Sequence, residues 1–129
     1  MRGLWGVLAA ACAAGASAQT APKFAEVQPG AGREAYTAHC ASCHGDALEG
    51  VRYGPPLRGG SFAERWSGQP VRALYEYTAT NMPEDNPGGL DAAVYAATLA
   101  YVLQQNGVEP APIPLSAAQP DALLPQLRP

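Results

Sequence analysis

The chain has 129 residues, of which 47% are hydrophobic and 15% are charged, and this length suits a single domain. Its formal net charge is −3 at pH 7, which argues against a nucleic acid or an anionic membrane surface as a partner. It holds three cysteines and two histidines, so any thiol or imidazole chemistry depends on very few side chains.

Residues 1–18 have the pattern of a secretory signal peptide. Arg2 supplies a positive n-region, residues 4–16 are apolar, and the small residues of 16–18 have the A-x-A form that precedes a cleavage site. The apolar stretch is too short to remain as a membrane-spanning helix. We therefore expect the mature chain to begin at Gln19 and to be periplasmic.

Cleavage changes both the charge and the cysteine count. A lipoprotein signal cut before Cys12 is the alternative, but its n- and h-regions would be unusually short. Cleavage after Ala18 removes Arg2 as well as Cys12, which leaves seven basic and eleven acidic side chains, a net charge of −4. Only Cys40 and Cys43 then remain. If both bind a cofactor, no thiol is left for a structural disulfide, so the cofactor must stabilise this small domain.

A helix is predicted from Gly30 to His39, with Tyr36 on its inner face, and it runs into Cys40-Ala41-Ser42-Cys43-His44. The Cys-x-x-Cys-His spacing is typical of c-type haem attachment. The two thiols add across the two vinyl groups of the porphyrin. His44 then lies under the iron and can supply the proximal axial nitrogen.

Two other kinds of site use a similar pair of thiols. A closed zinc site needs a second ligand pair, and the mature chain beyond the motif offers only His39 and no further thiol. A thioredoxin-like dithiol needs a fold built from βαβ units, and the sequence shows no convincing run of strands. Haem attachment is therefore the favoured interpretation, and a periplasmic location agrees with it.

The elements after the motif are predicted to be loops and helices. Residues 45–69, rich in glycine and proline, are predicted to be mostly loop. A helix is predicted over 70–81, since proline suits its first turn, and a longer one over 90–106, with Gly107 as its C-cap. The Pro-rich tail, 108–129, either wraps on its own domain, which we favour, or serves as a docking arm.

The second axial ligand follows from elimination. Outside the motif, the mature chain offers His39, Met82 and Lys23. His39 directly precedes Cys40, and such a short tether cannot bring it to the opposite face of the ring. Met82 lies farther along, in a polar stretch rich in turn residues, where Pro83 favours an extended backbone. We expect Met82 to bind the iron; a gap-filling core methionine is the alternative.

With these features the chain resembles a class I monohaem cytochrome c over about residues 30–107. The resemblance implies an all-α fold of three to five short helices wrapped around one covalently bound haem c. On this basis residues 19–29 are an N-terminal extension and 108–129 a C-terminal tail. The matching pieces occur in the family's order: a glycine-tyrosine helix, Cys40-Ala41-Ser42-Cys43-His44-Gly45, Gly54-Pro55-Pro56-Leu57, Asn81-Met82-Pro83 and Ala100-Tyr101-Val102.

The resemblance implies supporting roles near the motif. The carbonyl of Pro55 is expected to accept the free N–H of the His44 ring and so fix its orientation. Gly32 and Tyr36 are expected to cross the last helix near Tyr101, where the glycine allows a close approach.

Other roles implied by the resemblance concern the haem surface. Leu57, Leu99 and Val102 would line the haem face. Arg65 and Trp66 would reach the propionates, or else form a surface pair.

A narrower resemblance rests on Ser61-Phe62-Ala63-Glu64-Arg65-Trp66, Leu74-Tyr75-Glu76-Tyr77, Met82-Pro83 with Pro87-Gly88, and Asn106-Gly107 before the tail. These segments resemble cytochrome c subunits and domains that accept electrons from periplasmic quinoprotein (PQQ-dependent) alcohol and sugar dehydrogenases. The implied function is a one-electron carrier, not an enzyme, that passes electrons to an oxidase or another acceptor of the respiratory chain. The alternatives are a five-coordinate gas-binding or peroxidase protein and a permanent electron-relay subunit of a larger oxidoreductase.

Overall fold

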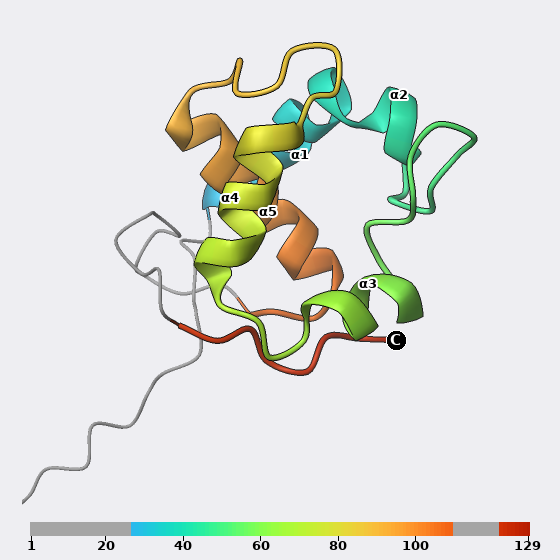
Figure 1. Ribbon diagram of the computed structural model, residues 1–129, viewed down its shortest axis with the longest axis vertical. Helices are drawn as coiled ribbons and strands as arrows, with labels where there is room; N and C mark the ends of the chain where they lie inside the picture. Colours follow the sequence, from blue (N-terminus) through green and yellow to red (C-terminus); the bar gives the residue numbers. More distant parts are fainter. Residues whose placement is uncertain (1–26, 110–121) are drawn as a thin grey trace, which may run out of the picture.

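The computed structural model describes residues 27–109 and 122–129, so the proposed signal peptide lies outside the described part. The regular structure within these ranges is helical, and its only β-type pairings are two isolated bridges. The predicted all-α class is therefore confirmed. None of the described helices is long and apolar enough to cross a bilayer. The helices, in chain order (Figure 1), are α1 Val27–His39, α2 Ala41–His44, α3 Gly60–Trp66, α4 Val71–Asn81 and α5 Ala92–Gln105.

Three predicted helices are found close to their expected bounds. α1 begins before the expected Gly30, with Pro29 in its first turn, where a missing N–H costs no hydrogen bond. α4 ends at Asn81 as expected, and Pro70 stands just before its first helical residue. α5 is shorter at its start than the predicted 90–106, because Asp91 has extended backbone angles.

The predicted C-cap of α5 is also found. Gly107 has a φ of +91°, a conformation that glycine adopts without strain. The N–H of Gly107 bonds to the carbonyl of Gln104, and that of Val108 bonds to the carbonyl of Leu103, both at 3.0 Å. These two bonds form a Schellman motif, and the two apolar side chains at its ends belong to the same core.

The glycine-rich stretch 45–69 contains a helix that the sequence did not predict. α3 buries Phe62, Ala63 and Trp66, whose spacing places them on one face. Gly59 and Gly60 directly precede this apolar group, and the helix is short, so the turn residues concealed the helical pattern. Packing against the core stabilises α3 more than its intrinsic propensity does.

α1 and α5 cross at close range, as the resemblance implied. A Cβ atom on Gly32 would collide with the carbonyl of Ala97 and lie 2.9 Å from the Cβ of Tyr101. Next to this contact, the rings of Tyr36 and Tyr101 pack with their centroids 5.5 Å apart. The crossing fixes the end of α1, from which the Cys-x-x-Cys-His motif continues.

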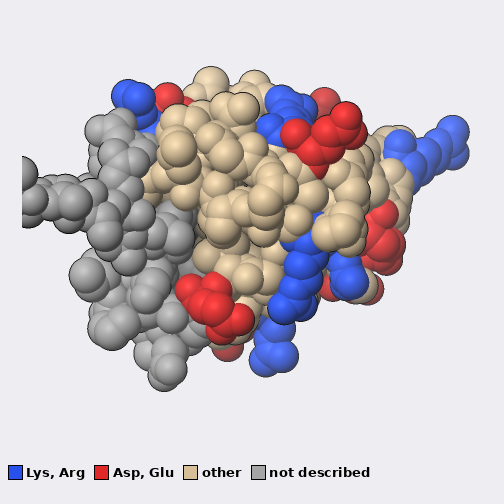
Figure 2. Space-filling view, turned by 90° about the horizontal axis from the view of Figure 1, so that it is seen from below, with Lys and Arg blue, Asp and Glu red and all other residues tan. Residues whose placement is uncertain are grey.

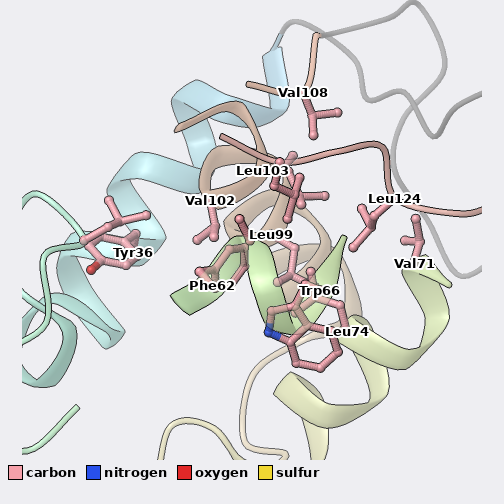
Figure 3. Close-up of a cluster of buried hydrophobic side chains, with 14 of the residues drawn as sticks. Tyr36, Phe62, Trp66, Val71, Leu74, Leu99, Val102, Leu103, Val108 and Leu124 are labelled. Atoms are coloured by element: carbon pink, nitrogen blue, oxygen red, sulfur yellow. The ribbon is translucent and has the colours of Figure 1, made fainter. Parts of the chain in front are cut away.

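The C-terminal segment 122–129 packs against the connection between α3 and α4. The N–H of Leu124 bonds to the carbonyl of Gln69 at 2.8 Å, and the carbonyl of Leu124 accepts the N–H of Gly68 at 3.0 Å. The described end of the tail thus covers its own domain; residues 110–121 lie outside the described part. Figure 3 shows the core that this segment joins, which includes Phe62, Trp66, Val71, Leu74, Leu99, Val102, Leu103, Val108 and Leu124. Leu127 belongs to the same core.

This packing predicts a large difference between two adjacent leucines. Leu124 is 2% exposed and Leu123 is 51% exposed. We expect Leu124→Ala to lower the free energy of unfolding by about 2–4 kcal/mol, because it empties a packed core position. Leu123→Ala should change it by less than about 0.5 kcal/mol. Guanidinium unfolding of the two holoprotein variants measures this difference, and equal effects would contradict the packing of the segment.

Candidate haem-attachment site

The two cysteines lie on a single helical turn that continues directly from α1. The N–H of Cys40 bonds to the carbonyl of Tyr36 at 2.8 Å, which extends the α1 hydrogen-bond ladder. The carbonyl of Cys40 in turn accepts the N–H groups of Cys43 at 3.1 Å and of His44 at 2.9 Å. Residues three apart on a helix share a face, so this turn presents both sulfur atoms on one side.

Both thiols are free and half-buried. Burial, and to a lesser degree the neighbouring Cys43, raises the pKa of the Cys40 thiol to about 11. In this structure the thiol of Cys40 is therefore neutral near pH 7. Thioether formation removes this titratable group.

The ring of His44 is buried and held by one hydrogen bond. Its Nδ1 lies 2.8 Å from the carbonyl oxygen of Pro55, the contact that the resemblance implied. A carbonyl oxygen only accepts, so Nδ1 carries the hydrogen and donates it. In the neutral imidazole, this leaves the lone pair on the other ring nitrogen, Nε2, where a metal ligand needs it.

Gly54 makes this arrangement possible. A Cβ atom at position 54 would collide with the carbonyl of Cys43 and lie 2.9 Å from Nδ1 of His44. The surrounding loop is fixed by the N–H of Gly50, which bonds to the carbonyl of His44 at 2.7 Å. In the sequence, Gly54 was noted only as part of the segment Gly54-Pro55-Pro56-Leu57 that resembles the family. Its close approach to Cys43 and His44 was not predicted, because a sequence pattern does not show which backbones come together.

A matched pair of glycine variants tests this contact. Gly54→Ala is expected to lower the free energy of unfolding of the holoprotein by about 1–3 kcal/mol, because the added methyl group overpacks the space beside His44. Gly60→Ala is the control, since a Cβ atom there meets no heavy atom within 4 Å. Guanidinium unfolding compares the two. A Gly54→Ala protein as stable as the control would show that the loop adjusts without cost.

Tyr36 also holds the residue that follows the motif. Its hydroxyl donates to the carbonyl of Gly45 at 2.6 Å, in a buried position. Burial raises the pKa of this phenol well above its ordinary value. Tyr36 therefore stays protonated and remains a donor. Its helical spacing predicted packing but not this hydrogen bond.

Met82 follows directly after α4 and has the extended backbone that Pro83 predicted. Its φ and ψ are −123° and 152°, and the Met82–Pro83 peptide bond is cis. Its N–H bonds to the carbonyl of Thr78 at 2.8 Å, and its carbonyl accepts the hydroxyl of Tyr95 at 2.7 Å. The side chain is half-buried. Tyr95 stands at helical spacing with Leu99 and Val102, a pattern that predicts core packing but not this hydrogen bond to Met82.

The apolar residues assigned to the haem face lie in or beside the core. Leu99 and Val102 are 4% and 2% exposed, and Leu57 packs against the same cluster while remaining half-buried. The carbonyl of Leu57 accepts the side-chain amide of Asn106 at 2.9 Å, which ties its loop to the end of α5. Their contact with haem stays a prediction.

Arg65 and Trp66 come together with Tyr77, a residue that had no predicted role. The Arg65 guanidinium lies 5.1 Å from the Trp66 ring centroid and 4.6 Å from that of Tyr77. This is the geometry of a cation–π contact. Trp66 is buried and Arg65 is exposed, so the pair joins the core to the surface. A contact with the haem propionates stays a prediction.

His39, the histidine that precedes the motif, is exposed at the end of α1.

These observations define a class of protein. The donor set fits a haem c: two thiols lie on one helical turn, an oriented histidine follows them, and a glycine leaves space for its ring. With the all-α fold, this is a monohaem c-type cytochrome, an electron-transfer protein with a covalently bound haem c.

The comparisons agree with this class. Residues 27–102 match the model of the family described as cytochrome C oxidase, cbb3-type, subunit III. This match spans more than half of the chain, which therefore belongs to that family. Comparison with curated proteins and with solved structures returned no match.

Proposed function

We propose that the protein carries single electrons in the periplasm, with His44 and Met82 as the two axial ligands of its haem c. One observation carries the choice of Met82. This residue, the candidate left by elimination, is held by hydrogen bonds at both its N–H and its carbonyl. A ligand presented from such a fixed backbone needs little rearrangement to bind a metal.

The chain's residues provide what a carrier needs. When bound, haem c supplies an iron that takes up and releases one electron, and thioether ligation favours its reduced form. Cys40 and Cys43 anchor the group covalently, and Pro55 fixes the ring of His44. With side chains at both axial positions, no ligand has to bind or leave during electron transfer.

Optical spectroscopy of the purified holoprotein tests the ligation. The oxidised protein should show the band at about 695 nm that marks a Met–Fe bond. The spectrum of the reduced protein should not change when carbon monoxide is added. A high-spin oxidised spectrum with binding of carbon monoxide would instead favour the gas-binding or peroxidase alternative.

The proposed location is supported by the sequence of residues 1–18 and by the motif, because c-type haem is attached outside the bacterial cytoplasm. N-terminal sequencing of the native protein should give a chain that begins at Gln19, recovered in the periplasmic fraction. A native protein that retains residues 1–18, or begins at Cys12, would contradict the proposed processing.

We further propose a quinoprotein (PQQ-dependent) dehydrogenase as the electron donor, on the resemblance of segments such as 61–66 and 74–77. Partners of such carriers meet through small, short-lived interfaces, below about 1,200 Å². The net charge of −4 after cleavage favours a positively charged docking patch on the partner. Figure 2 shows acidic and basic side chains interspersed around a largely uncharged centre on one face.

Stopped-flow reduction by candidate dehydrogenases would rank the donors. The rate constant with the true donor should fall as the ionic strength rises, since salt screens the attraction between opposite charges. A rate independent of ionic strength would rule out electrostatic steering. Failure of every quinoprotein dehydrogenase to reduce the protein would overturn this choice of donor without affecting the ligation.

The family description favours a second candidate, because it names a subunit of an oxidase. The chain would then relay electrons inside a permanent complex. Size-exclusion chromatography of the protein extracted from its native source distinguishes the two. A stable monomer supports a free carrier, and co-elution with a larger oxidoreductase supports the relay.

A further inference from the structure

We propose that Tyr95 is a positioning residue for Met82: its hydroxyl bridges the two ends of the Met82–Leu90 loop and so holds the methionine in place as an iron ligand. This proposal rests on the proposed function, since it assumes that Met82 binds the iron. Tyr95 itself acts through the backbone and does not bind the metal.

A single oxygen atom makes both contacts. The hydroxyl of Tyr95 donates to the carbonyl of Met82 at 2.7 Å. The same oxygen accepts the backbone N–H of Leu90 at 3.4 Å. The first bond fixes the residue that carries the sulfur, and the second fixes the point where the chain returns toward α5. Tyr95 thus closes the loop at its base.

Tyr95 is itself rigidly held. It is 3% exposed and lies in the first turn of α5, where its N–H bonds to the carbonyl of Asp91 at 3.1 Å. Its ring packs edge-on against that of Tyr75, at 77° and with the centroids 6.3 Å apart. Tyr75 belongs to α4, the helix that Met82 follows. The hydroxyl is therefore fixed relative to both helices that the loop connects.

The loop between these two ends has little other support. Residues 84–89 are exposed. The loop is closed on itself by turn bonds, from the N–H of Asn86 to the carbonyl of Pro83 and from the N–H of Gly89 to the carbonyl of Asn86, both at 2.9 Å. Such exposed local bonds order the turn but do not attach it to the core. The attachment at its base comes from the phenol of Tyr95 and from the bond of Met82 to Thr78.

Two single-atom changes test the proposal. Tyr95→Phe removes the hydroxyl and keeps the buried ring. Tyr75→Phe removes a hydroxyl from the ring packed against it, without touching the bond to Met82. The readout is the rate at which imidazole binds to the oxidised holoprotein, because imidazole can bind only after the methionine has left.

Tyr95→Phe should bind imidazole about fivefold faster than the wild type, the factor expected for one lost hydrogen bond. Its 695 nm band should also disappear at a lower temperature. Tyr75→Phe should match the wild type within about twofold. Equal rates for Tyr95→Phe and the wild type would overturn the proposal, as would an equal acceleration in both variants.

Two further measurements distinguish a local role of Tyr95 from a loss of global stability and from a failure of the proposed Met82 ligation. Leu124→Ala is expected to lower global stability from a core position in the C-terminal segment. If it accelerated imidazole binding as much as Tyr95→Phe does, the acceleration would reflect global stability, and the positioning role of Tyr95 would be overturned. A wild-type protein without the 695 nm band would refute the ligation itself. A wild type with the band and a Tyr95→Phe variant of unchanged rate would refute only the role of Tyr95.

Discussion

Replacing both Cys40 and Cys43 by alanine is expected to give a chain that holds no covalent haem and is largely unfolded at 25 °C. The described structure contains no disulfide at these thiols, which are both free for the cofactor. If both bind the cofactor, the mature chain has no thiol left for a disulfide, and the thioethers are its covalent staple. A covalent staple in a small domain contributes about 2–5 kcal/mol, and the apolar porphyrin adds buried area beyond this. A domain of this size is stable by only about 5–15 kcal/mol in total.

Far-UV circular dichroism and haem staining of a denaturing gel measure this outcome. The double variant should lose most of its helical signal and all of its stain. Ser42→Ala is the matched control, because Ser42 lies between the two cysteines on α2 and is exposed. It should keep both signals. A double variant that folded as well as this control would show that the polypeptide core alone stabilises the domain.

Much of the fold follows from local signals in the sequence. α5 has a long apolar period and a glycine just beyond its end, and both features act within the helix itself. α4 is bounded by Pro70 before it and by Met82-Pro83 after it. Where a local signal starts and stops an element, the prediction was close. α3 was missed because Gly59 and Gly60 stand at its start and because its helical state depends on burying Phe62 and Trp66 in the core.

The candidate site likewise combines features that the sequence predicted with features that it did not. The attachment motif is local, and the bond from His44 to Pro55 could be expected because the resemblance supplied a pairing across the loop. The hydrogen bonds of Tyr36 and Tyr95 reach backbone carbonyls 9 and 13 residues away, and no motif or resemblance indicated either pairing. A tyrosine at helical spacing predicts only that its ring is buried, since the pattern says nothing about the direction of its hydroxyl.

The C-terminal segment shows why composition can mislead. Its prolines exclude a helix, yet Leu124 and Leu127 are 2% and 4% exposed. The backbone of this segment finds its hydrogen-bond partners at the α3–α4 connection and, through Arg128, at the carbonyl of Asn106. These contacts are long-range, so no property of the tail alone could have located them. The non-helical segment 122–129 thus joins the core because the rest of the domain supplies its hydrogen-bond and packing partners.

Met82→Ala is expected to have the largest effect on electron transfer. Removing the thioether opens the sixth position of the iron, so the 695 nm band should disappear and the reduced protein should bind carbon monoxide. Thioether ligation favours the reduced form, and its loss should lower the reduction potential by on the order of 0.1 V or more. Reduction by the donor would slow accordingly, because less driving force remains.

Spectroelectrochemical titration and carbon monoxide binding check this prediction, with Thr80→Ala as the control. Thr80 is exposed on the last turn of α4 and should leave both properties unchanged. The sequence holds two methionines, and the other is Met1. The mature chain expected from cleavage after Ala18 therefore contains Met82 as its one methionine. A Met82→Ala protein that kept the band would show that the band does not come from a Met–Fe bond. A variant that lost the band yet did not bind carbon monoxide would show that another side chain binds the iron in place of the sulfur. The fixed backbone of Met82 would then not be required to fill the sixth position.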